Sequence, residues 1–161
     1  VKPLPSRKIN REVPLIDCFI APCKEGCPIH QDITTYLQLV GEGKYEEAMD
    51  VITEKNPLPF ITGTICAHAC MGKCTRNFYE DPVHIREMKK VAADNGYDAL
   101  IAKLSAPAVT KEGKAAVVGG GPAGMAAAYF LRRAGMAVTL FEKKSALGGV
   151  VRHVIPEFRI P

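Results

Sequence analysis

Six cysteines stand in two groups whose spacing suits a metal centre. The first group consists of Cys18, Cys23 and Cys27, and the second of Cys66, Cys70 and Cys74. Gaps of three and four residues bring several thiolates within reach of one inorganic core, and thiolates are the usual ligands of iron–sulfur clusters. All six cysteines are therefore candidate metal ligands.

The end of the first group indicates how the two groups combine. Cys27 precedes Pro28, as in ferredoxin-type sequences in which the last cysteine before a proline binds the other cluster. On a helix, Cys66 and Cys74 would lie about 12 Å apart along the axis, too far for one small cluster. We therefore expect two interleaved sites, formed by Cys27, Cys66 and Cys70 and by Cys18, Cys23 and Cys74.

The number of ligands leaves the composition of these sites open. Two 4Fe–4S clusters take eight ligands, whereas the chain has six cysteines. Two ligands are then not cysteine, or one cluster takes four thiolates and two remain free, or the second site is vestigial. His68 lies inside the second group and is a further candidate, although a lone histidine there is more often solvated.

Zinc and disulfides are the competing explanations of the cysteines. Zinc sites space their paired cysteines by two to four residues, so these gaps do not exclude zinc, but no Cys-x2-Cys pair occurs. No apolar run reaches the roughly 18 residues of a membrane span, and no signal-peptide core is present. We therefore expect a cytoplasmic, reducing location without membrane attachment, where metal is favoured over disulfides.

A glycine-rich turn predicts a dinucleotide site. Gly119, Gly121 and Gly124 form Gly-x-Gly-x-x-Gly between an apolar stretch and a helical one, which is the context that such a turn needs. The first glycine allows the tight turn, the second lets the backbone approach a pyrophosphate, and the third brings helix against strand. The phosphates would then lie at the helix N-terminus, beside Pro122 and Ala123.

Three residues further along extend this site. Glu142 ends the second apolar stretch, where a carboxylate binds both ribose hydroxyls and repels a 2′-phosphate, as for FAD or NAD. Gly148 and Gly149 would let another loop approach the phosphates. The alternative is a βαβ unit without a ligand.

The elements that position these residues change type along the chain. Apolar spacing of i, i+3, i+4, i+7 predicts helices over 33–40 and 45–52, followed by helices over 82–95 and 98–104 that Asn95-Gly96 separates. Residues 105–113 have the composition of a linker. Strands at 114–118 and 136–141 around a helix over 122–134 then predict one parallel βαβ unit, with strands apolar throughout as a sheet covered on both faces requires.

The net charge of +4 is mild and its basic residues are scattered. The few that gather before residue 12 lack interleaved aromatic residues, so we expect no nucleic-acid partner.

The order of these features resembles the family of glutamate synthase small subunits, and the N-terminal region of dihydropyrimidine dehydrogenase is similar. The resemblance covers about residues 10–161 and rests on Asn56-Pro-Leu-Pro-Phe60, Gly63-Thr-Ile-Cys66, Pro82-Val-His-Ile85 and Ile155-Pro-Glu-Phe-Arg-Ile-Pro161. It implies an α-helical ferredoxin domain with two 4Fe–4S clusters, an FAD domain and an NAD(P)H domain. Electrons would pass between flavin and clusters toward a partner catalytic centre, and the implied ligands agree with the interleaved sites.

Three segments resemble a branch of this family that is linked with selenate reduction, namely Asp17–Cys23, Gln31–Ile33 and Ile85–Lys89. Two positions depart from the family pattern. Leu15 stands where a further cysteine usually precedes Cys18, and Lys89 stands where a Gln or Glu ligand often lies, with Glu87 two residues out of register. Both sites would then be one ligand short, the site of Cys18, Cys23 and Cys74 most of all.

These observations predict an α+β chain with an all-α helical ferredoxin domain over 1–104, a linker over 105–113 and the first βαβ of a Rossmann-like FAD domain over 114–161. We expect a fragment of an NAD(P)H-dependent iron–sulfur flavoprotein oxidoreductase, inactive alone and joined to other subunits or domains. Two strands do not close a doubly wound sheet, so 114–161 is expected to be poorly ordered or paired between chains, with weak or no FAD binding. The alternative function is a non-enzymatic metal-binding interaction module.

Overall fold

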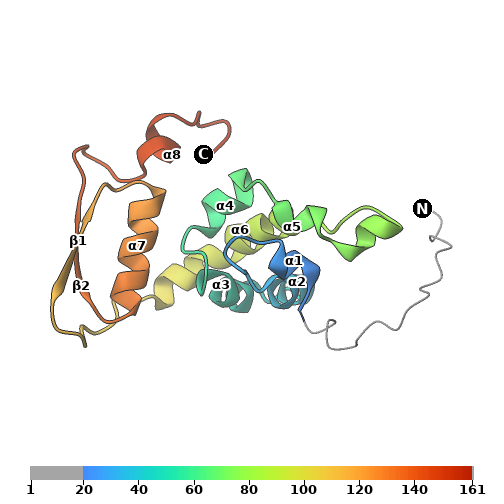
Figure 1. The fold of residues 1–161 in the computed structure, drawn as a ribbon, viewed down its shortest axis with the longest axis horizontal. Coiled ribbons are helices and arrows are strands. Elements are labelled where there is room, and N and C mark those ends of the chain that lie inside the picture. The colour runs from blue at the N-terminus through green and yellow to red at the C-terminus, as the bar shows by residue number, and fades with distance from the viewer. Residues whose placement is uncertain (1–19, 161) are drawn as a thin grey trace. The chain divides into compact units, whose positions relative to one another are not determined.

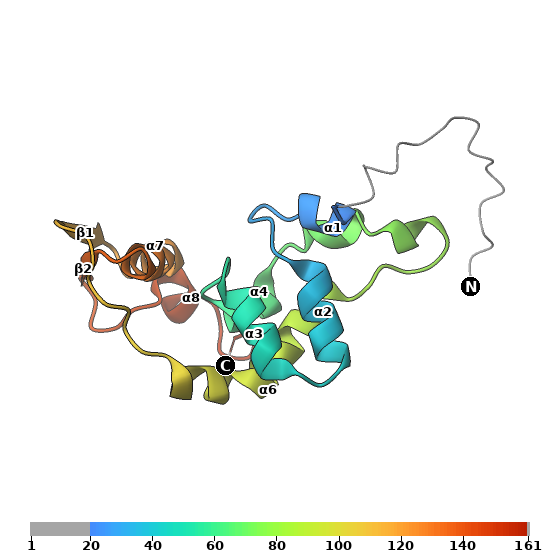
Figure 2. The same cartoon turned by 90° about the horizontal axis from the view of Figure 1, so that it is seen from below.

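Apolar side chains at helical spacing build the core of the N-terminal part of the chain. The computed structural model describes residues 20–160, so Cys18 and the basic residues before residue 12 lie outside the described residues. Helices α2 (Ile33–Gly41) and α3 (Tyr45–Thr53) pack against each other (Figure 2). The predicted apolar stripes are buried in them, with Ile33, Tyr36, Ala48, Met49 and Ile52 almost without exposure.

Helix α6 (Ile85–Lys103) runs through the break predicted at Asn95-Gly96. The prediction of two helices is wrong because Gly96 is used for packing. A Cβ at Gly96 would lie 2.7 Å from the carbonyl oxygen of Tyr45 and 2.8 Å from Cγ of Met49. The missing side chain thus lets α6 approach α3 closely, and this contact outweighs the low helix propensity of glycine.

The segment that carries the second cysteine group is not one helix. It contains α4 (Pro59–Ile65), α5 (Ala69–Gly72) and the 3-10 helix η2 (Thr75–Phe78). His68 interrupts the winding between α4 and α5 with a left-handed φ of 48°. The helical spacing assumed for this group therefore does not apply, because a residue in this conformation ends a right-handed helix.

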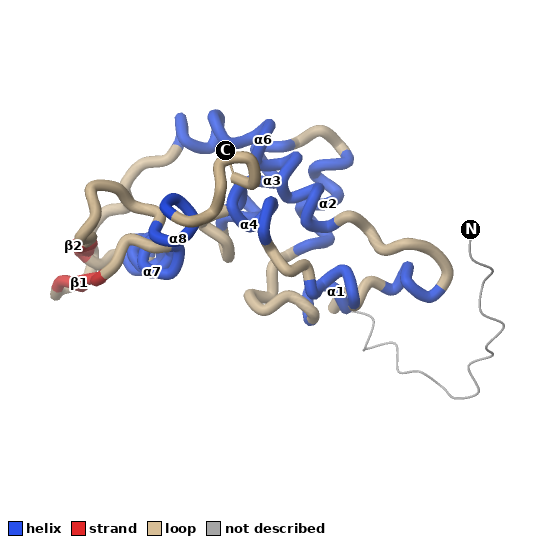
Figure 3. The backbone as a smooth tube through the Cα atoms, turned by 90° about the horizontal axis from the view of Figure 1, so that it is seen from above, coloured by secondary structure: helices blue, strands red, loops and turns tan. Residues whose placement is uncertain are grey.

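The C-terminal part forms the predicted parallel βαβ unit. Strands β1 (Lys114–Val118) and β2 (Ala137–Phe141) pair in parallel, with Lys114 opposite Ala137 and Val118 opposite Phe141. Helix α7 (Pro122–Arg133) connects them and packs on the sheet (Figure 1), and the short helix α8 (Gly149–His153) follows. Strands occur in this part of the described chain alone (Figure 3).

One face of this sheet lacks the cover that its apolar strands lead one to expect. Val118 is 86% exposed and its partner Phe141 is 55% exposed in the described chain. A parallel sheet is normally covered on both faces. That this unit is poorly ordered or pairs between chains stays a prediction.

The chain divides into two compact units, and the boundary lies between Asp98 and Ala99. The domain bounds 1–104, 105–113 and 114–161 stay a prediction from the sequence. In the part that the structure describes, no helix combines the length and the apolar character that crossing a membrane requires.

Candidate functional site

The first cysteine group lies at a short helix that packs against the second group. Cys23 lies in α1 (Pro22–Glu25), which begins with a proline, and Cys27 follows this helix. Helix α1 packs against α5 (Figure 1). A Cβ at Gly26 would lie 2.7 Å from Cγ of Lys73, so the glycine allows the two cysteine segments to approach. Residues some forty positions apart are thereby brought together.

The second group is spread over three elements. Cys66 caps the C-terminus of α4, Cys70 lies in α5 and is 8% exposed, and Cys74 precedes η2. The left-handed conformation of His68 turns its backbone N–H toward Cys66, to whose Sγ it donates a hydrogen bond of 3.4 Å. Hydrogen bonds to ligand sulfur are one of the means by which proteins adjust iron–sulfur clusters.

Thiols from the two groups interact across the α1–α5 contact. Cys70 interacts electrostatically with Cys27 and Cys66, and burial together with Cys27 raises the pKa of the Cys70 thiol. Cys23 interacts electrostatically with Cys74 and, more weakly, with Cys27. Burial is again the main cause that raises the pKa of the Cys23 thiol. Metal coordination favours the thiolate, so a bound cation would reverse the direction of both shifts.

Thiols, backbone donors and a buried phenol make up the surroundings of this site. The five described cysteines are free thiols. Among residues 20–160, no three His, Cys, Asp or Glu side chains converge as ligands of a single metal ion. The ligands of a multi-iron cluster bind different irons and stand further apart than those of one ion. The sulfur donors of these dispersed thiols are thus the type of ligand that an iron–sulfur core requires.

Tyr36 joins this site to the helical core. Its buried hydroxyl donates a hydrogen bond of 3.2 Å to the carbonyl of Ile85, at the start of α6. Burial raises the pKa of this hydroxyl, and the neighbouring thiols, Cys70 first and Cys27 second, act in the same direction. The phenol therefore stays protonated and holds α2 against the first turn of α6.

The non-cysteine candidates differ in their surroundings. Lys89 is buried, and its ammonium interacts electrostatically with Cys70. Glu87 is engaged through one oxygen, because its Oε1 accepts a hydrogen bond of 2.7 Å from Arg86, while Oε2 is buried without a hydrogen-bond partner in the described chain. Nδ1 of His68 is buried and has no hydrogen-bond partner in the described chain.

The glycine turn has the geometry that its spacing predicts. The N–H of Gly119, which has a φ of 101°, donates a hydrogen bond of 2.7 Å to the carbonyl of Phe141 at the end of β2. A Cβ at Gly124 would collide with the carbonyl oxygen of Gly119. Gly121 caps α7, with Pro122 as its first residue, and nothing lies nearer than 4.0 Å to a Cβ built there. The turn is therefore tight at its first and third glycines and open at its second.

Glu142 and the second glycine pair lie against this turn. Oε2 of Glu142 accepts a hydrogen bond of 2.7 Å from the N–H of Gly120, and Oε1 accepts one of 2.8 Å from the N–H of Lys144. These donors, Lys144 first, hold the pKa of the carboxyl below its usual value. The N–H of Gly148 donates a hydrogen bond of 2.8 Å to the carbonyl of Gly120. Glu142 thus supports the turn, a role that sequence reasoning missed.

A cavity of about 590 Å³ opens beside the turn. Its lining includes Gly119, Glu142 and Gly149 together with Lys143 and Lys144. This volume lies within the usual range for ligand pockets, roughly 300–1,000 Å³. Of the predicted residues, Gly121, Pro122, Ala123, Gly124 and Gly148 do not line it.

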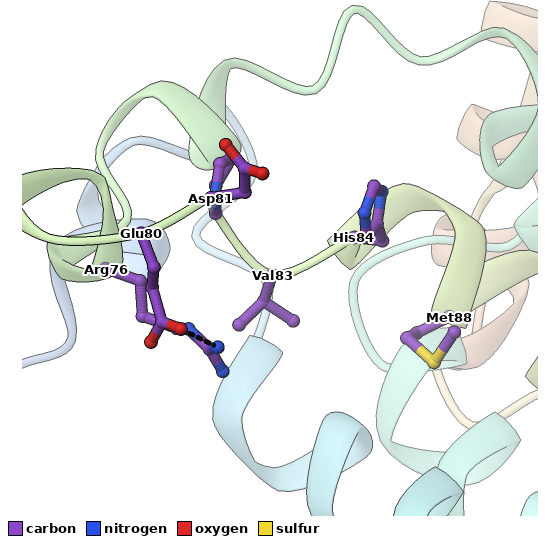
Figure 4. Close-up of a pocket in the computed structure, with 7 residues that line it drawn as sticks. Arg76, Glu80, Asp81, Val83, His84 and Met88 are labelled. Atoms are coloured by element: carbon purple, nitrogen blue, oxygen red, sulfur yellow. Dashed lines mark ion pairs between the residues drawn. The ribbon is translucent and has the colours of Figure 1, made fainter. Parts of the chain in front are cut away.

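A second cavity, of about 570 Å³, contains no predicted site residue. Arg76 and Glu80 form an ion pair of 2.7 Å at one side, while His84 and Met88 stand at the other (Figure 4). The adjacent acidic residues Glu80 and Asp81 are a sequence signal for it. None of the described thiols lines this cavity.

Comparisons with known proteins agree with this chemistry. The model of the family described as dihydropyrimidine dehydrogenase domain II, 4Fe-4S cluster, matches residues 10–100, and that of an NAD(P)-binding Rossmann-like domain matches residues 117–158. YgfK of Escherichia coli strain K12, which is named as an oxidoreductase, is 47% identical over 161 residues, covering 99% of this chain and 16% of YgfK.

Two further relatives are more distant. The NADPH-Fe(3+) oxidoreductase subunit beta of Geobacter sulfurreducens strain DL-1 / KN400 is 36% identical over 91% of this chain and 22% of its own length. The glutamate synthase [NADPH] small chain of Mycobacterium tuberculosis strain CDC 1551 / Oshkosh is 36% identical over 90% of this chain and 30% of its own length.

The chain thus spans less than a third of the length of these relatives. The resemblance to glutamate synthase small subunits and to dihydropyrimidine dehydrogenase is confirmed, as is the predicted class of a helical ferredoxin-type domain followed by a Rossmann-like βαβ unit. The chain belongs to the dihydropyrimidine dehydrogenase domain II, 4Fe-4S cluster family.

Proposed function

We propose that this chain relays electrons between a flavin and a partner catalytic centre of an iron–sulfur flavoprotein oxidoreductase. The observation that carries the proposal is the interaction of thiols from two distant segments, Cys27 with Cys70 and Cys23 with Cys74. Iron–sulfur clusters take up and release single electrons when bound to such thiolates.

The two clusters take their ligands from both segments. One site comprises Cys27, Cys66 and Cys70, and the other comprises Cys18, Cys23 and Cys74. The packing of α1 against α5 and the close approach of Gly26 to Lys73 support this assignment. Burial of Cys70 favours restricted solvent access at the site of Cys27, Cys66 and Cys70. The hydrogen bond from the N–H of His68 to the sulfur of Cys66 supports a ligand role for this sulfur.

FAD is the dinucleotide that we assign to the C-terminal unit. The open backbone at Gly121 supports an approach of the pyrophosphate to the N-terminus of α7, beside Pro122 and Ala123. Glu142 is ionised and lines the neighbouring cavity, where its free lone pairs suit ribose hydroxyls. Gly148 and Gly149 bring the following loop against the turn.

NAD(P)H is the proposed electron source in the longer protein, and other subunits or domains are its partners. The printed names of relatives, such as NADPH-Fe(3+) oxidoreductase subunit beta, support this part. A cytoplasmic location and selenate as terminal acceptor rest on sequence resemblance and cysteine usage. Selenate-dependent oxidation of NADPH by the longer protein tests the acceptor. If the longer protein does not oxidise NADPH with selenate, selenate alone is removed from the proposal.

Iron and acid-labile sulfide analysis after anaerobic purification tests the proposed function. We expect both elements in equal amounts, with brown colour, and a lower content of both in a Cys70→Ser variant, because one of the two sites then loses a ligand. Lys90→Ser, a change at a half-exposed position outside the thiols, serves as a control that keeps both. Zinc without sulfide would contradict the proposal and favour the metal-binding interaction module.

A further inference from the structure

Lys89 occupies a position in α6 where the neighbouring buried residues are apolar. It follows Ile85 by one turn and precedes Ala92 by one turn, and both of these are at most 2% exposed. Lys89 itself is only 7% exposed. Lysine is almost never buried to this degree unless its charge is compensated, because removing an unpaired ammonium from water is costly.

No carboxylate forms an ion pair with this ammonium within residues 20–160. The ion pairs of α6 join Glu87 to Arg86 and Lys90 to Asp94, and none of the ion pairs in the described residues includes Lys89. A group that does interact with Lys89 electrostatically is the thiol of Cys70, which is itself 8% exposed. The candidate counter-charge of Lys89 therefore lies among the cysteines.

The start of α6 is held at the same group of thiols. Tyr36 donates its hydrogen bond to the carbonyl of Ile85, one turn before Lys89. The same Tyr36 side chain interacts electrostatically with Cys70 and Cys27, and also with Cys66. The thiols of one proposed site and the turn that carries Lys89 thus meet at a single buried side chain.

We propose that the Lys89 ammonium compensates the negative charge of a cluster bound by Cys27, Cys66 and Cys70 and thereby raises its reduction potential. This inference rests on the proposed function. Three thiolates make the bound core anionic, and each added electron increases its negative charge. A buried cation nearby stabilises the reduced state more than the oxidised state, because opposite charges interact strongly where water is excluded. Lys89 acts by charge and not as a ligand.

Three variants distinguish an effect of the Lys89 charge from an effect of its side-chain shape and from a role of Lys89 as a cluster ligand. Lys89→Met removes the charge and keeps the length of the side chain. Lys89→Arg keeps a charge that cannot be lost by deprotonation, so arginine replaces the ammonium without replacing an amine ligand. Lys90→Met is the matched control, because it removes an equal charge from the next residue of the same helix, where the ammonium is half-exposed and 2.7 Å from Asp94.

Redox titration of the cluster-loaded chain, followed by electron paramagnetic resonance, is the primary measurement. The signal that disappears in Cys70→Ser identifies the site. For that signal we expect the midpoint potential to become more negative in Lys89→Met. The midpoint potential should stay near the wild-type value in Lys89→Arg and in Lys90→Met. Equal potentials in Lys89→Met and Lys90→Met would overturn the inference, as would loss of the cluster in Lys89→Arg, which would make Lys89 a ligand.

Thermal unfolding of the metal-free and loaded forms gives an independent readout. Lys89→Met should raise or leave unchanged the Tm of the metal-free chain, because it removes a buried charge without a carboxylate partner, and lower the Tm of the loaded chain. A similar fall in both forms would show a packing role and contradict the inference. Wild-type protein without iron would instead refute the proposed function itself.

Discussion

Glu142 shows how one carboxylate serves both the fold and the proposed ligand site. Its two oxygens accept backbone hydrogen bonds from Gly120 and Lys144, so it joins the end of β2 to the glycine turn. Sequence reasoning assigned this residue to a ribose by its place after the strand. It did not predict the bond to Gly120, because two positions 22 residues apart in sequence meet only once the strands are paired.

The hydrogen bonds of Glu142 predict an acid-sensitive turn. Because its folded-state pKa lies below the ordinary glutamate value, the bonds stabilise the fold fully above the unfolded-state pKa. This stabilisation is lost as the pH falls through the lower, folded-state pKa. We expect a carbon-13 titration of the Glu142 carboxyl to give a midpoint below the ordinary value. A midpoint at or above it would contradict these hydrogen bonds.

At the scale of elements, glycines decide which segments approach each other. Gly96 faces the backbone of α3, whereas nothing lies within 4 Å of a Cβ built at Gly41, the last residue of α2. We expect Gly96→Ala to destabilise the chain by about 1–3 kcal/mol through overpacking.

Gly41→Ala is the matched control for this prediction and should stabilise by about 0.4–1 kcal/mol, because alanine restricts the unfolded chain. Urea unfolding of both variants provides the comparison. Equal effects of the two substitutions would show that α6 does not depend on the close contact at Gly96.

The glycine turn offers a second comparison. Gly124→Ala places a Cβ against the carbonyl of Gly119, so it should lower the stability of the βαβ unit by about 1–3 kcal/mol. Gly121→Ala has room and a φ of −73°, and should change stability by less than about 0.5 kcal/mol. Thermal unfolding followed by circular dichroism measures both. A larger loss for Gly121→Ala would reverse the assigned roles of the two glycines.

Much of the fold follows from local patterns, and the remainder depends on tertiary contacts. The predicted strand 114–118 is β1, and the two apolar stripes of 33–40 and 45–52 are α2 and α3. The continuity of α6 through Gly96 and the left-handed His68 had no local signal, since both arise from close packing and from the path of the cysteine segment. The cysteines themselves were evident from spacing, whereas the burial of Lys89 was not.

At the scale of the molecule, two parts of the N-terminal unit become stable by different means. The α2–α3–α6 core buries large apolar side chains, whereas α1 has no buried residue and α5 has only Cys70. We expect the proposed clusters to stabilise these segments, because the free energy of metal binding then contributes to folding.

Metal removal is therefore expected to loosen the cysteine segments selectively. After chelation of iron, amide hydrogen exchange should become fast over residues 20–30 and 66–81, while α2 and α3 keep their protection. Cluster-loaded protein is the control. Uniform loss of protection would mean that the core and the cysteine segments form one cooperative unit.

The most direct test of the account asks which cysteines share a cluster. Four single variants, Cys23→Ser, Cys27→Ser, Cys70→Ser and Cys74→Ser, are compared by electron paramagnetic resonance after reduction. Interleaved ligands predict that Cys27→Ser and Cys70→Ser remove one signal, and that Cys23→Ser and Cys74→Ser remove another. Loss of one signal in Cys23→Ser and Cys27→Ser, and of a different one in Cys70→Ser and Cys74→Ser, would contradict the convergence of the two segments on shared clusters.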